Sequence, residues 1–298
     1  MSDTRASIEV IIPTTCITGR WAVLQRAIGT VASQDAVNVR VLVVVNGDRF
    51  DPDCLAALRA RSDLRVHYQL EGNLPLALRV GRSLVEAPFF CFLDDDDEYL
   101  PGALAYRVQP MLADPRVDFT ASVGLRCVDG GDRLALTELQ VDQINAQPLL
   151  SLGVENWLAS CGGLYRSSSI SLDYFDGVTQ YYEWTYLAYR LAIDKTLRYL
   201  ERPTFRINDS SDSLSKSAAY RLAEIDVLHK LLDLPLPRKA QVEIRRKIGS
   251  AHHRISDYCL EQGWRMPAWQ HHLKSLLYPG GWKYSTYSRH LLLQRSKA

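Results

Sequence analysis

A run of acidic residues near the end of the first third of the chain could do chemistry. Residues 94–97 are all aspartate, follow directly on the apolar residues 88–93 (PFFCFL), and precede Glu98. Adjacent carboxylates repel one another, so such a cluster is costly unless a positive charge lies beside it. Carboxylate oxygens suit Mg²⁺ or Mn²⁺, particularly where phosphate oxygens complete the coordination shell. The run therefore predicts a divalent-cation site that also holds a phosphorylated ligand.

Two other interpretations of the run are a solvated loop and the DDxxD metal motif of prenyl-diphosphate enzymes. Charged residues are mostly exposed, which favours the loop where no context is given. Residues 88–93 give that context, because a buried strand would deliver the acids to one edge of a sheet. The DDxxD motif belongs to helices of all-α proteins, whereas PFFCFL is typical of a strand and position 98 is Glu. We therefore reject that motif.

The first hundred residues alternate between strand-like and helix-like segments. Apolar strands are expected at 8–13, 39–45, 64–69 and 88–93, and helices at 20–33, 53–61 and 74–86. This order predicts an α/β fold whose mainly parallel sheet has right-handed crossovers and helices on both faces. Ligands of such sheets bind beyond the carboxyl ends of the strands. Thr14, Thr15, Asn46 and the acidic run all stand at these ends, so we expect them to form one site.

The rest of the chain follows a looser pattern. Strands are expected at 117–128, 162–167 and 197–207, and a helix at 181–193. From 216 the chain reads as helical to its end, with breaks near Pro235 and Pro237, Gly263, Pro267 and 279–281. We predict a catalytic domain over 1–215 and a helical C-terminal region over 216–298.

Composition excludes several classes of protein. The 298 residues are 47% hydrophobic and 23% charged, with a net charge of +1, which is ordinary for a globular protein with a buried core. The six cysteines are scattered without a CxxC pair, which favours reduced thiols over disulfides or a zinc site. The N-terminus lacks a signal-peptide pattern, and no run approaches the ~20 apolar residues of a membrane span. We predict a cytoplasmic protein, with peripheral contact at the inner face of the membrane as the alternative.

Four segments together resemble family 2 glycosyltransferases. IIPTTCITGRWAVLQRAIGTVASQ is similar to the family's opening segment, VLVVVNGD to its second strand, GNLPLALRVGRSL to its "NxGxxxARNxG" helix, and FFCFLDDDDEYLPGAL to its DxD segment. Together they cover about residues 8–105. The resemblance implies the GT-A fold, a Rossmann-like sheet flanked by helices, with a donor half over about 1–115 and an acceptor half over about 116–215. It also implies a nucleotide-sugar donor, a divalent cation and inversion at the anomeric carbon.

The resemblance implies nucleotide-binding roles for the first two strand ends. Pro13, Thr14 and Thr15 would lie along the nucleotide, and Asn46 would approach the base. Val45 stands where the family often has an aspartate that contacts uracil, so a UDP-sugar is favoured but not fixed. Without the resemblance, Thr14 and Thr15 could cap the next helix, and Asn46 could form a tight turn.

The resemblance places the diphosphate beside the third helix and the acidic run. Arg79 matches the family's helix arginine and would face the diphosphate or its neighbouring acids, or it is a surface residue paired with an acid. Asp94 and Asp95 would reach the ribose and the donor sugar. Asp96 would be the main ligand of Mn²⁺ or Mg²⁺. Val80 departs from the family, which has Asn there.

A catalytic base is expected at the start of the helix at 181–193. Inverting transfer needs a carboxylate that takes the acceptor's proton, and the family supplies it from an "ED" pair. Here Glu183 either matches the first residue of that pair or, shifted by one, is the base, which is the alignment we adopt. Glu183 could instead only interact with the helix dipole, and Asp173 and Asp176 are then the nearest candidates.

Four aromatic residues and one loop belong to the acceptor side of this reading. Trp157, Tyr181, Tyr182 and Trp184 either form an aromatic wall for a sugar or lipid acceptor or are plain core. Residues 205–215 are similar to a loop that some relatives fold over the donor. Within it, Asn208 replaces a frequent histidine ligand.

The C-terminal region is basic and rich in aromatic residues. Residues 238–298 contain twelve Lys and Arg against three Asp and Glu. We expect a helical cap on the catalytic domain, and membrane-surface contact is the alternative. No motif supports nucleic-acid binding.

These observations predict an inverting glycosyltransferase that extends a cell-surface glycan or lipid-linked acceptor, a role in polysaccharide biosynthesis. One alternative is an inactive nucleotide-sugar-binding or scaffold protein, because the aspartate of the "ED" pair is missing. A sugar nucleotidyltransferase is the other, although PTTCITGR lacks the expected glycine-rich loop.

Overall fold

The computed structural model describes residues 5–128, 130–137, 139–208 and 217–293. The chain divides into two compact units, Met1–Ser210 and Ser211–Ala298. Residues 209–215 of the predicted donor loop, and with them the predicted boundary at 215, lie outside the described residues.

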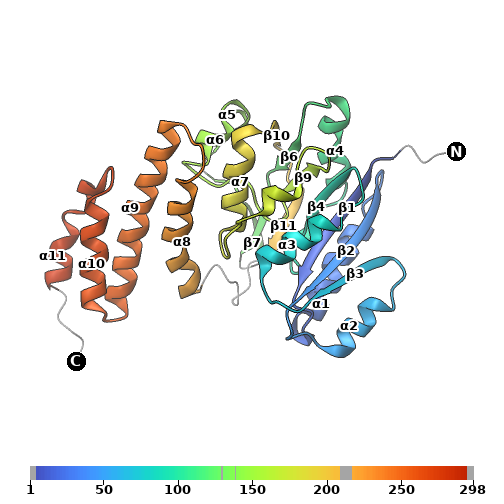
Figure 1. The fold of residues 1–298 in the computed structure, drawn as a ribbon, viewed down its shortest axis with the longest axis horizontal. Helices are drawn as coiled ribbons and strands as arrows, with labels where there is room; N and C mark the ends of the chain where they lie inside the picture. Colours follow the sequence, from blue (N-terminus) through green and yellow to red (C-terminus); the bar gives the residue numbers. More distant parts are fainter. Residues whose placement is uncertain (1–4, 129, 138, 209–216, 294–298) are drawn as a thin grey trace. The chain divides into compact units, whose positions relative to one another are not determined.

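The first unit contains a seven-stranded sheet in the order β10-β6-β9-β4-β1-β2-β3 (Figure 1). All neighbouring pairs are parallel except those of β9, which runs antiparallel to both β4 and β6. The strands are β1 (Ser7–Thr14), β2 (Asn38–Asn46), β3 (Leu64–Gln69), β4 (Phe89–Phe92), β6 (Phe119–Ser122), β9 (Gly163–Arg166) and β10 (Leu197–Leu200). The predicted α/β fold with a mainly parallel sheet is confirmed.

A second, four-stranded sheet has the order β5-β11-β7-β8. Its strands are β5 (Glu98–Tyr99), β7 (Leu125–Val128), β8 (Gly131–Leu134) and β11 (Phe205–Asn208). β11 pairs with β5, which follows the acidic run directly, so this sheet lies beside the run. β5 and β8 carry no clear sequence pattern and were not predicted.

The predicted strands 117–128 and 197–207 are wrong, because each divides into two strands that belong to different sheets. The first divides at Gly124, where an added Cβ would lie 2.1 Å from the Phe205 ring. The second divides around Pro203, which cannot donate a ladder hydrogen bond. The first break depends on a contact distant in sequence, whereas the second has a local cause.

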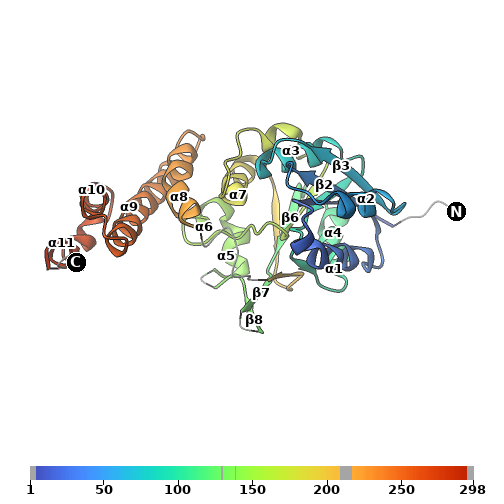
Figure 2. The same cartoon turned by 90° about the horizontal axis from the view of Figure 1, so that it is seen from below.

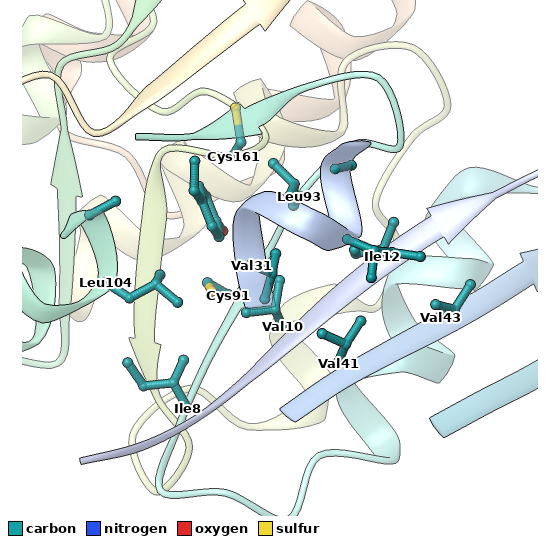
Figure 3. Close-up of a cluster of buried hydrophobic side chains, with 14 of the residues drawn as sticks. Ile8, Val10, Ile12, Val31, Val41, Val43, Cys91, Leu93, Leu104 and Cys161 are labelled. Atoms are coloured by element: carbon teal, nitrogen blue, oxygen red, sulfur yellow. The ribbon is translucent and has the colours of Figure 1, made fainter. Parts of the chain in front are cut away.

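Helices line both faces of the larger sheet, as expected. Those of the first unit are α1 (Trp21–Ala32), α2 (Pro52–Arg59), α3 (Leu74–Ser83), α4 (Ala103–Ala113), α5 (Val141–Ala146), α6 (Pro148–Ser151) and α7 (Glu183–Asp194), with short 3-10 turns η1 (Thr18–Arg20) and η2 (Leu172–Phe175). Ile8, Val10 and Ile12 of β1 point into the core that includes α1 and α4 (Figure 3). Ile11 faces the other way, against Gly81 of α3, where an added Cβ would lie 2.5 Å from it. Strand alternation thus fixes which side chains of β1 face each layer.

The second unit is helical, as predicted (Figure 2). It comprises α8 (Ala218–Leu231), α9 (Arg238–Glu261), α10 (Arg265–Leu276), η4 (Gly281–Tyr284) and α11 (Tyr287–Leu293). Breaks occur near Pro235, Gly263 and 279–281 as expected. The break expected at Pro267 is wrong, because Pro267 lies in the first turn of α10, where its missing N–H is not needed. In the described part of the chain, no helix is long and apolar enough to cross a membrane.

The second unit buries histidines between α9 and α10. His252 and His271 approach with their Nδ1 atoms 2.9 Å apart, so one of these atoms donates and the other accepts. His272 is fully buried, and its Nε2 lies 2.7 Å from Ser288 Oγ. Burial lowers the pKa of His252 to about 4, helped by the nearby charges of His271 and Lys274. These rings are therefore packed as neutral groups.

We expect acid to destabilise the second unit through His252. Its pKa in the folded state is below the ordinary 6.5, so the unfolded chain binds the proton more readily. Stability is then complete above pH ~6.5 and falls as the pH drops towards 4. Thermal unfolding followed by circular dichroism across this range should show a smaller loss of Tm for His252→Gln than for the unchanged protein. His290→Gln, at an exposed position of α11, is the control; equal slopes for all three proteins would contradict the assignment.

Candidate functional site

The acidic run lies at the carboxyl edge of the larger sheet, directly after β4. Thr14 at the end of the neighbouring β1 donates a 2.5 Å hydrogen bond from its hydroxyl to Asp95 Oδ2. Asp95 is 5% exposed. The predicted meeting of Thr14 with the acidic run is therefore present.

Arg20 supplies the positive charge that the acidic run needs. Its Nε lies 3.1 Å from Asp95 Oδ1, and its Nη2 lies 2.9 Å from Asp96 Oδ2. The hydrogen bond to Asp95 raises the pKa of Arg20 further above its ordinary value. Arg20 is the last residue of η1, which follows a turn in which Cys16 adopts a φ of 53°. The chain itself thus partly neutralises the cluster.

Asp97 and Glu98 are held by the second sheet. Asn208 of β11 donates from its backbone N to Asp97 Oδ1 (3.0 Å) and from its side-chain Nδ2 to Glu98 Oε1 (3.1 Å). Glu98 also pairs with Arg26 at 3.0 Å and Arg206 at 3.6 Å. Burial raises the pKa of Asp97 well above its usual range, and the charge of Asp94 adds to this. Asn208 thus ties the segment after β4 to β11 through Asp97, while its bond to Glu98 lies within the second sheet.

Asp94 stands apart from the other acids in its ionisation. Burial raises its pKa to about 7, a hydrogen bond from Ser160 opposes this, and the charges of Asp96, Asp95 and Glu183 raise it further. Asp94 therefore changes charge near neutral pH, unlike an ordinary aspartate. A cation beside it would favour its ionised form.

Glu183 is the first residue of α7 and lies close enough to Asp94 to affect its ionisation. It is 5% exposed, and its Oε1 accepts a 2.9 Å hydrogen bond from the backbone N of Tyr181, whose φ is 79°. Burial raises the pKa of Glu183. The fold thus brings this acid, 89 positions further along the chain than Asp94, to the same end of the sheet.

The two threonines after β1 differ in their surroundings. Thr14 donates to Asp95 and accepts from Cys16 N at 3.0 Å, and neither η1 nor α1 has a side-chain cap. The capping interpretation is therefore wrong. Thr15 Oγ1 is buried with no hydrogen-bond partner in the described structure. Pro13 is a buried residue of β1.

Asn46 and Arg79 make contacts away from the acidic run. Asn46 Oδ1 accepts 2.9 Å hydrogen bonds from Gln69 Nε2 and from Asn73 N, which joins the ends of β2 and β3 to the start of α3. Arg79 of α3 forms a 2.6 Å ion pair with Asp176, just after η2. Arg79 is therefore a surface residue of the helix paired with an acid, which was the alternative interpretation. The ion pair lies at the end of η2.

The aromatic residues of the predicted acceptor wall differ in how deeply they are buried. Trp157 is 2% exposed, its Nε1 donates to Pro148 O at 2.9 Å, and it stacks near Phe119, which favours the core interpretation. Trp184 packs edge-on to Phe92 of β4 with ring centroids 5.3 Å apart. Tyr182 occupies the N-cap position of α7 without a side-chain capping hydrogen bond, and it is partly exposed.

Within the described residues, no group of three or more His, Cys, Asp and Glu side chains is arranged to hold a metal ion. Asp96 has a side chain that is 26% exposed and can be reached by a cation, whereas Asp95 and Asp97 are buried and Asp94 and Glu98 are partly exposed. Asp96 Oδ2 already contacts Arg20. A cation at Asp96 would therefore depend on ligands that are not protein side chains, such as phosphate oxygens and water.

Sequence reasoning missed the counter-charges of the cluster. It assigned the whole compensation to a ligand, whereas Arg20 and Arg26 contribute part of it. The available signal was their position after the first strand, since the rule that gathers strand ends at one edge also gathers the loops that follow them. Ser160 could not be found in this way, because it lies in a loop without a periodic pattern.

We expect Thr14→Val and Thr15→Val to differ sharply in stability. Thr14→Val removes a buried hydrogen bond to a carboxylate and should lower the free energy of unfolding by about 1–3 kcal/mol. Thr15→Val removes a hydroxyl that has no partner, so the change should stay within about 0.5 kcal/mol or be stabilising. Urea unfolding measures both, and equal losses would contradict the described bonding of Thr14.

The family described as glycosyl transferase family 2 matches residues 9–154, a span that contains the acidic run but not Glu183. No curated protein matches the sequence.

The chain is similar in structure to TarS of S. aureus. A crystal structure of TarS 1–349 in complex with UDP-GlcNAc aligns with 96% of this chain and 88% of its own, at 14% identity and a TM-score of 0.62. TarS 1–349 without that ligand aligns with 87% and 74%, at 14% identity and a TM-score of 0.54. The longer TarS aligns with 83% of this chain and 43% of its own, at 15% identity and a TM-score of 0.54. At such identities the likeness shows the fold alone.

Proposed function

We infer that the chain is a glycosyltransferase of family 2 with the GT-A fold, since the family matches residues 9–154 and the fold is similar to that of TarS 1–349. We propose that it transfers a sugar from a UDP-sugar to an acceptor hydroxyl with inversion. The acceptor would be a glycan or a lipid-linked glycan in cell-surface polysaccharide synthesis. The UDP assignment is supported by the similar fold of TarS 1–349, which was crystallised with UDP-GlcNAc.

The observation that carries this proposal is that Glu183 lies near the acidic run at the end of β4. Trp184, which follows Glu183, packs against Phe92 of β4 with ring centroids 5.3 Å apart, and the charges of Asp96 and Glu183 both act on Asp94. Family 2 enzymes need two functions at one place: a site for the donor diphosphate and a base for the acceptor. The arrangement provides candidates for both.

The donor would lie along the ends of β1, β2 and β4. We assign nucleotide contacts to Pro13, Thr15 and Asn46, and the unpartnered hydroxyl of Thr15 is a polar group that a donor could satisfy. Thr14 would act by holding Asp95, since its hydroxyl is already used. Arg79 would reach the diphosphate only by leaving its partner Asp176.

Asp94 and Asp96 would bind the donor sugar and cation, with Asp95 shaping the local field. Members of the GT-A fold often use divalent metals, and here Mn²⁺ or Mg²⁺ would be held by Asp96 with donor phosphates. Such a cation, when bound, neutralises the departing diphosphate. Arg20 contacts both Asp95 and Asp96, so it competes with a cation at Asp96 and could itself contact a phosphate.

Glu183 would take the proton of the acceptor hydroxyl. The acceptor oxygen then forms a bond to the anomeric carbon from the face opposite the diphosphate, while the bond between that carbon and the diphosphate oxygen breaks. Burial raises the pKa of Glu183, which makes its carboxylate a better base. Tyr182 and Trp184, beside Glu183, are candidates for acceptor contact, and Trp157 is less suited because it is buried.

We further propose that residues 1–215 form the catalytic domain, with the donor half over about 1–115 and the acceptor half over about 116–215. The helical region 216–298 would contact the membrane peripherally from the cytoplasmic side. Glu183, which follows the donor half, would then serve acceptors presented at the inner membrane face.

Asp96→Ala should abolish metal-dependent donor turnover while the protein stays folded. Loss of the charge that anchors the cation should reduce turnover of UDP-sugar at least about 100-fold. Release of UDP in the presence of Mn²⁺ measures this, and circular dichroism checks the fold. Asp35→Ala, an exposed acid that precedes β2 at the opposite edge of the sheet, is the matched control and should keep its activity. Full activity of Asp96→Ala would refute the metal role.

Glu183→Gln should separate transfer from donor binding. Removal of a general base costs about 10²- to 10⁴-fold in rate, while thermal stabilisation by UDP-sugar and Mn²⁺ should persist because the donor site is intact. Asp173→Asn and Asp176→Asn should retain transfer. Unchanged transfer by Glu183→Gln would assign the base elsewhere, and donor binding without turnover in the unchanged protein would support a nucleotide-sugar-binding protein instead.

A further inference from the structure

Exposed apolar side chains are concentrated near the end of the second unit. In the described part of the chain, seven of the twelve exposed large apolar side chains lie between 264 and 293. They are Trp264, Met266, Leu273, Leu277, Trp282, Leu292 and Leu293. Such a concentration on a folded protein marks a surface that contacts something apolar.

Three of these side chains form a stripe on α10. Met266, Leu273 and Leu277 are spaced by seven and four residues, so they lie on one face of the helix. They are 71%, 55% and 83% exposed. The buried residues of α10, Ala268, His272 and Ser275, occupy the opposite face. α10 therefore buries the imidazole of His272 and exposes its large apolar side chains to solvent.

The charged side chains of the same segment are all positive. Residues 264–293 include Arg265, Lys274, Lys283 and Arg289, all exposed, and contain no Asp or Glu. Trp264 and Trp282 add side chains that favour the boundary between apolar and aqueous phases. Large apolar groups, tryptophan and cations without acids are the combination found in helices that lie in a membrane interface.

We propose that the α10 stripe with its flanking cations docks this protein on an anionic phospholipid surface. This inference rests on the second unit alone and not on the proposed transfer reaction, although it names the partner of the membrane contact suggested there. The leucines and methionine would enter the acyl boundary, and the four cations would face lipid phosphates.

Charge argues against the other occupants of this surface. A second copy would bring cations against cations, since residues 264–293 contain no acid to pair with them. Nucleic acid would satisfy the cations but would leave the aliphatic stripe in water, because its outer surface is phosphate. An anionic bilayer satisfies both features.

The experiment is co-sedimentation of the full chain with vesicles of phosphatidylcholine alone and of phosphatidylcholine with phosphatidylglycerol. The unchanged protein should bind the anionic vesicles preferentially. Met266→Gln/Leu273→Gln/Leu277→Gln should weaken this binding about tenfold or more. The matched control is Leu70→Gln/Leu112→Gln/Leu134→Gln, three exposed leucines of the first unit, which should bind normally.

The cations are tested separately. Lys274→Gln/Lys283→Gln/Arg289→Gln should weaken binding to anionic vesicles about a hundredfold and leave binding to phosphatidylcholine unchanged. The exposed positions should leave the fold intact, which circular dichroism checks, and turnover with a soluble acceptor should be unaffected, which separates this proposal from the proposed function. Equal vesicle binding by the stripe variant and its control would overturn the proposal. So would a lipid-free dimer that the stripe variant dissociates, or binding to DNA in place of vesicles.

Discussion

The burial of carboxylates at the end of β4 is the constraint around which the first unit is organised. Removing a carboxylate from water costs several kcal/mol unless it is paired and hydrogen-bonded. Asp95 meets this demand with Thr14 and Arg20. Because Thr14 ends β1 and Arg20 precedes α1, the strand, the turn at Cys16 and the helix must all be placed correctly before Asp95 can be buried. The site therefore depends on the layout of the sheet, and local sequence alone does not specify it.

The acids of the run divide into those that hold the structure and those left for a ligand. Asp95, Asp97 and Glu98 have protein partners, and Asp97 connects the end of β4 to the second sheet through Asn208. Asp94 is protonated more readily than an ordinary aspartate because it is buried and, to a smaller extent, because acidic neighbours surround it. A fixed arrangement of partly uncompensated carboxylates is a field preorganised for a cation, and without that cation it would repel a diphosphate.

The regular part of the fold and the location of the site followed from periodicity, while the partners did not. Buried parallel strands are nearly continuous apolar runs, so β1, β2 and β4 were recognisable, and the strand-end rule placed Thr14 beside the acids. Arg20 was not recognised as a partner of the acids, since the periodicity that predicts a helix from residue 20 does not show what its side chain contacts. Asn208 was considered only as a replacement for a metal ligand, whereas it fastens Asp97 and Glu98. Both roles are set by contacts between segments far apart in sequence.

The second unit buries some polar side chains and exposes some large apolar ones. α9 and α10 pack His252 and His272 inside, and the pKa of each is lowered by burial, so their polar atoms are kept neutral at a cost. The same unit leaves Leu277 and Trp282 in contact with solvent. Aliphatic side chains in place of His252 and His272 would add hydrophobic stabilisation, which the present core lacks. The outward aliphatic stripe of α10 is flanked by exposed cations, and residues 264–293 contain no Asp or Glu, so an apolar surface with anionic groups is the one that complements it.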